Sequence, residues 1–227
     1  MHVVQREGWP SPAWGVVSPP ESRLGASLAV VAAVALYAAL PERFTLGPVW
    51  LLPALEFAIL VPLAFVAPRR HAQEATWHRI ASVVLIALVN AANMVSLVRL
   101  VANILVGSNA PGTNLVFAAL QIWLTNVLVF GLWYWELDRG GPAARCRPDH
   151  REPDFLFPQM NAPDSAPPAW APQFLDYLYL GFTNATAFSP TDTLPLTGWA
   201  KFLMLVQSLA SLLTVALVAA RAVNILT

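Results

Sequence analysis

Charged side chains are scarce in this chain. Asp, Glu, Lys and Arg make up 11% of its 227 residues, against roughly 25% in an average soluble domain. Apolar residues make up 57%, and the mean hydropathy is +0.56. This composition predicts an integral membrane protein, with the lipid bilayer as its main partner. The net charge is zero, so charge gives no reason to expect a nucleic-acid partner.

Cysteine and paired histidine side chains are also lacking. Cys146 is the only cysteine, which excludes an intrachain disulfide and a cysteine-cluster metal site. No two of the four histidines stand at a helical metal-ligand spacing. The sequence has no nucleophile motif and no cluster of acidic residues either. We therefore expect no bound metal, no cofactor and no enzymatic activity.

No apolar run typical of a signal peptide occurs in residues 1–23, which we interpret as an N-terminal tail. A bilayer core needs about 20 apolar residues per helix, and five later segments are predicted to span it. They are residues 24–40, 48–67, 79–106, 114–135 and 199–226. The expected fold is an all-α protein of the cell membrane, a bacterial inner membrane, with a four-helix transmembrane region over 24–135.

Two stretches interrupt this pattern of spans. Residues 136–173 are rich in proline and charge and have no hydrophobic period, so they predict a polar, solvent-exposed loop in which only 154–157 could pack back onto the membrane domain. Residues 174–188 are too short to span and too apolar for a loop. Our preferred interpretation is a re-entrant half-helix that enters the membrane within the unit 174–227. The alternative is an amphipathic helix lying on the bilayer surface.

The C-terminal stretch 174–226 resembles the pore module of potassium channels. Residues 179–183 (YLGFT) are similar to the end of the family's pore helix, and 217–223 (LVAARAV) to a common inner-helix ending. The resemblance implies a pore loop between these helices. Because one chain carries one such loop, a pore would require a homo-oligomer, most simply a homotetramer, which would pass a monovalent cation.

The selectivity filter departs from the family pattern. Ser189 and Thr191 stand where the family has glycines, and Pro190 stands at its tyrosine. A ladder of carbonyls aimed at the ion needs positive φ at those glycines, whereas proline fixes φ near about −65°. Potassium selectivity therefore does not carry over. Either a non-selective polar constriction remains, or the loop kept the shape of a pore module and lost conduction.

A second resemblance covers the chain from end to end. Uncharacterised bacterial integral membrane proteins, grouped only as a domain of unknown function, have two N-terminal spans, an arginine-rich loop similar to Arg69-Arg70-His71, and two further spans that end in aromatic residues. An acidic, aromatic loop, a tyrosine-rich half-helix with a polar turn and a final span follow. This resemblance implies the same architecture and brings no activity.

Two sets of polar residues are candidates for function. The first is the polar turn after the half-helix. Its hydroxyls and carbonyls would line a pore, and Asp192 would add negative charge that favours cations. The alternative is a simple turn in which Asp192 accepts backbone hydrogen bonds. The second lies inside predicted spans, where ionisable groups are costly. The turn comprises Thr183, Asn184, Thr186, Ser189, Pro190, Thr191 and Asp192, and the intramembrane set comprises Glu56, Asn90, Asn93, Arg99 and Asn103.

The intramembrane set allows two interpretations. Asn90 and Asn93 share one face of their helix, and Arg99 and Asn103 share roughly the opposite face. We favour hydrogen bonds between helices, and a proton or ion relay through Glu56, paired with Arg99 or with those amides, is the alternative.

The charge distribution and the channel resemblance predict opposite membrane orientations. Arginines in 69–79 and 139–151 place both loops in the cytoplasm by the positive-inside rule, whereas a channel-like pore needs the second loop outside. The sequence thus predicts a cation-conducting pore without potassium-type selectivity. The alternative is a non-conducting membrane protein with a structural, assembly or sensory role.

Overall fold

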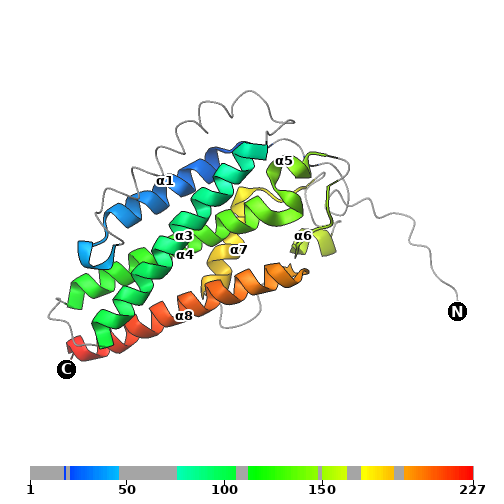
Figure 1. Ribbon diagram of the computed structural model, residues 1–227. Helices are drawn as coiled ribbons and strands as arrows, with labels where there is room; N and C mark the ends of the chain where they lie inside the picture. Colours follow the sequence, from blue (N-terminus) through cyan, green and yellow to red (C-terminus); the bar gives the residue numbers. More distant parts are fainter. Residues whose placement is uncertain are drawn as a thin grey trace, which may run out of the picture.

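The computed structural model describes residues 18, 21–45, 76–105, 112–147, 150–162, 170–186 and 192–226 (Figure 1). These residues form seven α-helices, two short 3-10 turns and one two-stranded sheet. The long helices are α3 (Thr76–Leu105), α4 (Gly112–Leu137) and α8 (Gly198–Leu226). The shorter elements are α1 (Leu24–Ala38), α5 (Pro142–Arg145), α6 (Pro158–Asn161), α7 (Phe174–Thr186), β1 (Phe155–Leu156), β2 (Leu194–Pro195) and the 3-10 turns Glu42–Phe44 and Asp138–Gly140.

Three of the predicted spans are confirmed as helices that are long and apolar enough to cross a membrane. They cover Arg79–Leu105, Gly112–Gly140 and Gly198–Ala220. The first predicted span is a helix of 15 residues, about 22 Å long at 1.5 Å per residue, and so is shorter than a bilayer core of about 30 Å. The second predicted span, 48–67 with Glu56, lies outside the described residues. The described chain is therefore mostly helical, and the length and composition of its three long helices suggest a multi-pass membrane protein.

Helix α4 is the centre of the bundle. It packs against α1, α3, α7 and α8, and 61% of its most apolar window is buried, against 22% for α8. A helix that is apolar on all sides suits such a central position, because no face needs contact with water. In Figure 1, α1 and α8 run along opposite sides of the bundle, with α3, α4 and α7 between them.

Helix α7 begins beside the C-terminal end of α4 and runs back along it. At its start, the Phe174 ring lies 5.9 Å from the Trp135 ring at the end of α4. At its end, the Asn184 side chain donates to the carbonyl of Met204 in α8, 3.0 Å away. The chain is back at its starting end by β2, which pairs antiparallel with β1, Phe155 opposite Pro195. The helix of the predicted segment 174–188 is thus present and ends at Thr186.

Two glycines allow α4 and α7 to approach closely. A Cβ added to Gly181 would lie 2.9 Å from the Val127 carbonyl oxygen and 3.1 Å from the Gly131 nitrogen, both backbone atoms of α4. A Cβ on Gly131 would lie 3.1 Å from the Leu178 Cα. Since backbone atoms cannot move aside as a side chain can, position 181 requires glycine at this crossing, and a Cβ at Gly131 would push α7 away by a few tenths of an ångström.

The prediction that residues 136–173 form a solvent-exposed loop is wrong for most of the described residues in this range. Residues 136–147 and 150–162 fold over one end of the bundle, and we call them the end cap. Phe155 and Met160 are fully buried and Phe157 is 3% exposed, so 154–157 does pack back as foreseen. A run of charges predicts solvent exposure, but Asp138 and Asp154 are buried because their carboxylates accept backbone hydrogen bonds within the cap.

We expect Gly181→Ala to lower the free energy of unfolding by about 1–3 kcal/mol, the usual cost of overpacking, because its Cβ meets the α4 backbone. Gly198→Ala is the matched control, since nothing lies within 4 Å of a Cβ there. Unfolding of the purified protein in mixed micelles, followed by circular dichroism, measures both. Equal stability of the two variants would contradict the close approach.

Candidate functional site

Gln207, a fully buried residue of α8, forms three side-chain hydrogen bonds inside the bundle. Its Oε1 accepts hydrogen bonds from the Tyr134 hydroxyl at 2.6 Å and from the Asn184 amide at 2.7 Å. Its Nε2 donates to the Gly181 carbonyl at 2.7 Å. One side chain of α8 thus binds both α4 and α7. We call Tyr134, Asn184 and Gln207 the amide cluster.

Asn184 uses both ends of its amide in this cluster. Besides bonding Gln207, its Nδ2 donates to the Met204 carbonyl, and its Oδ1 accepts from the Ser208 hydroxyl at 3.2 Å. Asn126 of α4 adds a further link by donating to the Gln207 backbone carbonyl at 3.3 Å. The polar groups that α7 presents to α8 are therefore bonded within the chain.

The C-terminal carbonyls of α7 also have protein partners. An α-helix leaves its last four carbonyls without intrahelical donors. Here the Ser211 hydroxyl donates to the Ala185 carbonyl, and the Ser208 hydroxyl donates to the Asn184 carbonyl at 3.4 Å. The Thr186 hydroxyl donates to the Thr183 carbonyl at 3.2 Å. Hydroxyl groups, two of them from α8, thus cap the end of the half-helix.

The predicted polar turn is only partly brought together. Asn184 alone among its described members is buried, and it belongs to the amide cluster. The Thr183 hydroxyl donates to the Tyr179 carbonyl of its own helix at 3.0 Å, while the Thr186 and Asp192 side chains are exposed. Ser189, Pro190 and Thr191 lie outside the described residues. The described part of the turn forms no common polar surface.

The predicted intramembrane set is dispersed along α3. Asn93 donates to the Ile122 carbonyl of α4 at 3.3 Å, so it links two helices. Arg99 donates to the Thr45 carbonyl, and Asn103 donates to the Arg99 carbonyl at 2.8 Å. The Asn90 Oδ1 is buried without a partner among the described residues. The proposed pairing of Arg99 with residue 56 involves a segment outside the described part.

Sequence reasoning missed Gln207 and Tyr134. Gln207 lies within the final predicted span, and an amide buried inside a membrane helix needs a hydrogen-bond partner. The position of Gln207 in the sequence therefore indicates a contact between helices. Tyr134 lies near the end of the predicted span 114–135, where an aromatic side chain is expected at the membrane interface, but it is fully buried. Its role depends on how α4 and α8 are aligned, which no local pattern shows.

The end cap holds a second polar cluster. The Asp138 carboxylate accepts hydrogen bonds from the Asp154 backbone N–H at 2.8 Å and from the Tyr177 hydroxyl. The Asp154 carboxylate accepts from the Arg139 backbone N–H and the Trp199 indole, both at 3.0 Å. These two aspartates thus join the end of α4 to the starts of α7 and α8.

A neighbouring group of charges fixes the start of α7. The Glu21 carboxylate accepts from the Phe174 backbone N–H and from the Trp135 indole at 2.8 Å. The Arg145 guanidinium donates to the Trp135 carbonyl at 2.7 Å and lies 5.2 Å from the centre of the Tyr177 ring. An acidic group at a helix N-terminus is stabilised by the helix dipole, so Glu21 is well placed.

The described part of the chain contains no group of three or more His, Cys, Asp or Glu side chains that could hold a metal ion. Burial raises the pKa of the Cys146 thiol, so this side chain is not an activated thiolate. What the two polar clusters do is hold helices in place.

Comparisons of the chain with protein-family models, with curated proteins and with solved structures found no match. A functional assignment therefore rests on the geometry of the half-helix and its partners.

We expect Gln207→Leu to lower the free energy of unfolding by about 1–3 kcal/mol, because it removes the acceptor of the Tyr134 hydroxyl and of the Asn184 amide together with the side-chain donor to the Gly181 carbonyl. Tyr134→Phe removes the hydroxyl that donates to the Gln207 side chain. The double variant should therefore lose less stability than the sum of the two single variants. Micelle unfolding measures all three, and strict additivity would show that this hydrogen bond contributes nothing.

Proposed function

We propose that this chain is a membrane protein of five spans in which α7 is a re-entrant half-helix with a structural role and no conduction path. Three helices of spanning length support the membrane location. The fourth span is α1, despite its length of 15 residues. The described chain stops at Thr45, which accepts a hydrogen bond from Arg99, and resumes at Thr76, about 35 Å away along α3. A span over 48–67 would bridge that separation.

The re-entrant interpretation of α7 rests on where its two flanks lie. Phe174 and β2 are both at the end-cap end of the bundle, while Ala185 is bonded to Ser211, about 20 Å along α8 from Gly198. An amphipathic helix lying on the bilayer surface would keep its whole length at one depth. Helix α7 instead runs inward beside α4 and α8, which favours the half-helix.

The capped end of α7 is the observation that carries the structural role. A pore helix helps a cation when its negative C-terminal end and nearby carbonyls face the ion. Here the carbonyls of Thr183, Asn184 and Ala185 accept hydroxyl donors of the same chain, and the Asn184 amide is fully used. The end of the half-helix is therefore bonded to its own bundle, and α7 serves to lock α4 and α8 together.

A cation-conducting homo-oligomer is the second candidate. It is favoured by the order of half-helix, polar turn and long final helix, and by the exposed side chains of Thr186 and Asp192 on either side of the turn. Copies of the chain arranged around an axis would place several such turns together. This candidate needs a path lined by the turn, whereas the structural role needs none.

A flux experiment separates the two candidates. Protein reconstituted in liposomes is expected to pass K⁺ and Na⁺ no faster than protein-free liposomes do, because the polar groups at the end of α7 are bonded internally. A known potassium channel reconstituted in parallel shows that the assay works. Cation flux that falls in Asp192→Asn would contradict the structural role and establish the pore.

We also propose an orientation for the bundle. Arg23 precedes α1, Arg79 lies near the start of α3, and Arg139 and Arg145 follow α4, all at the end-cap end. The positive-inside rule assigns an arginine-rich end to the cytoplasm. In this orientation the half-helix enters from the cytoplasmic side and α8 ends outside, opposite to the channel-type orientation.

Reporter fusions test the orientation. We expect alkaline phosphatase fused after Thr227 to be active and green fluorescent protein fused there to be dark, because α8 carries the chain away from the end cap. Green fluorescent protein fused before Met1 is the matched control and should fluoresce. The reverse result at both ends would overturn the orientation and favour the channel-type one.

A further inference from the structure

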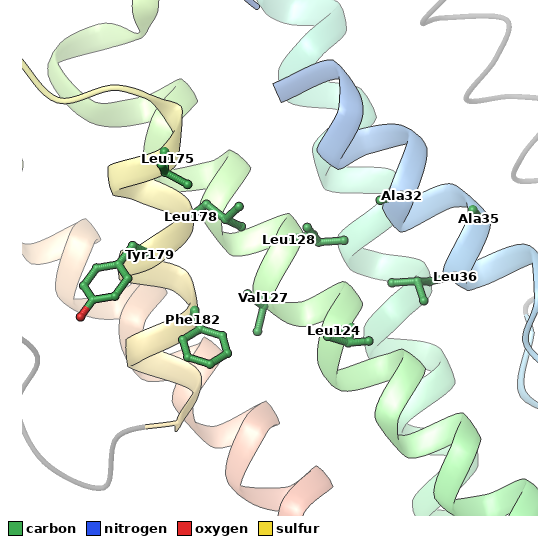
Figure 2. A pocket seen from close by; sticks show the side chains of 10 residues that line it. All are labelled: Ala32, Ala35, Leu36, Leu124, Val127, Leu128, Leu175, Leu178, Tyr179 and Phe182. Carbon is green, nitrogen blue, oxygen red and sulfur yellow. The ribbon is translucent and has the colours of Figure 1, made fainter. Parts of the chain in front are cut away.

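A groove runs between α1 and α7, with α4 as its floor (Figure 2). Its volume is about 710 Å³, within the range of about 300–1,000 Å³ common for ligand sites. Helix α1 contributes Ala32, Ala35 and Leu36; α4 contributes Leu124, Val127 and Leu128; and α7 contributes Leu175, Leu178, Tyr179 and Phe182.

The groove exists because α1 and α7 meet at one end only. Near the end cap, the Phe174 ring lies 3.0 Å from the position that a Gly25 Cβ would take. Further along, Leu36 and Phe182 line opposite walls across Leu124 (Figure 2). The outer flank of α7 is left uncovered, since Leu175 is 72% exposed and Phe182 is 47% exposed.

Water is a poor occupant of this groove. A bound water molecule needs two to four polar partners. The lining side chains are apolar apart from the Tyr179 hydroxyl, which points away from the groove in Figure 2. Leu124 and Leu128 lie in the middle of α4, so in a membrane-spanning bundle the groove lies at the depth of the hydrocarbon core.

We propose that the groove holds one acyl chain of a bilayer phospholipid, retained between α1 and α7. This inference rests on the membrane location proposed above. Apolar helix faces have no hydrophobic drive to associate within a bilayer, because lipid tails are as apolar as leucine, and those tails surround the groove at high concentration. The acyl chain fills the space between the two helices and supports α7 against α4 where no side chain does.

A photoreactive lipid tests the proposal. Protein is reconstituted with a phospholipid that carries a diazirine in one acyl chain, irradiated and mapped by mass spectrometry. Labelling should concentrate on the groove-lining residues of α1, α4 and α7 and exceed labelling of exposed leucines of α8 such as Leu205 and Leu209. Even labelling of both surfaces would overturn the proposal, because it would mean that the groove holds only freely exchanging lipid.

A filling variant and a matched control sharpen the test. Ala35→Phe projects into the groove and should reduce its labelling severalfold, whereas Ala216→Phe, on the exposed face of α8, should leave it unchanged. Circular dichroism shows whether each variant folds, and the smaller change Ala32→Leu replaces Ala35→Phe if that variant does not. Unchanged groove labelling in a folded filling variant would contradict a retained chain.

Two further measurements separate the other outcomes. In a Cys146→Ser background, Ala32→Cys places the only cysteine in the groove, and efficient disulfide-linked dimers would show that a second copy occupies it instead. Extraction of membranes with alkaline carbonate tests the location separately. Release of the protein would overturn the membrane location itself, whereas retention without groove labelling would overturn only the acyl-chain proposal.

Discussion

The arrangement of the bundle depends on one requirement: a polar amide buried among apolar helices must find its partners there. Gln207 meets this requirement with three short hydrogen bonds, to Tyr134 on α4 and to Gly181 and Asn184 on α7. Because apolar surfaces alone do not specify how helices align within a bilayer, such bonds fix their relative positions. The glycine pair at the α4–α7 crossing brings the backbones close enough for these bonds to form.

The end cap applies the same rule to full charges. Asp138 and Asp154 each accept a backbone N–H that belongs to the other's segment, so the two carboxylates hold the end of α4 and the chain before β1 together. Tyr177 and Trp199 then attach α7 and α8 to this pair. Removing the donors of a buried carboxylate costs more free energy than the hydrogen bonds contribute, because the carboxylate is left buried without partners. The hydrogen bonds of the cap therefore depend on one another. The half-helix is therefore fixed at its start by charge and at its end by amides and hydroxyls.

Much of the fold could be predicted from the sequence, because uninterrupted apolar length gives α3, α4 and α8, and a shorter apolar stretch over 174–188 gives α7. The end cap could not, since a run of charges and prolines has the same composition whether it is solvated or internally bonded. Asn184 was singled out for its place in a polar turn, but its partners lie on other helices. Gln207 was overlooked because a lone amide in an apolar span reveals its role only once α7 is placed beside it. The resemblance to a pore module stays a prediction.

The two-residue pairing of β1 with β2 has a topological consequence. Phe155 lies before α7 in the chain and Pro195 lies after it, so their pairing closes the base of a loop that contains the whole half-helix. The two ends of this loop are fixed to each other at the end cap, so the polypeptide on both sides of α7 is anchored at one point. Separation of the two strands would release both flanks of the half-helix together.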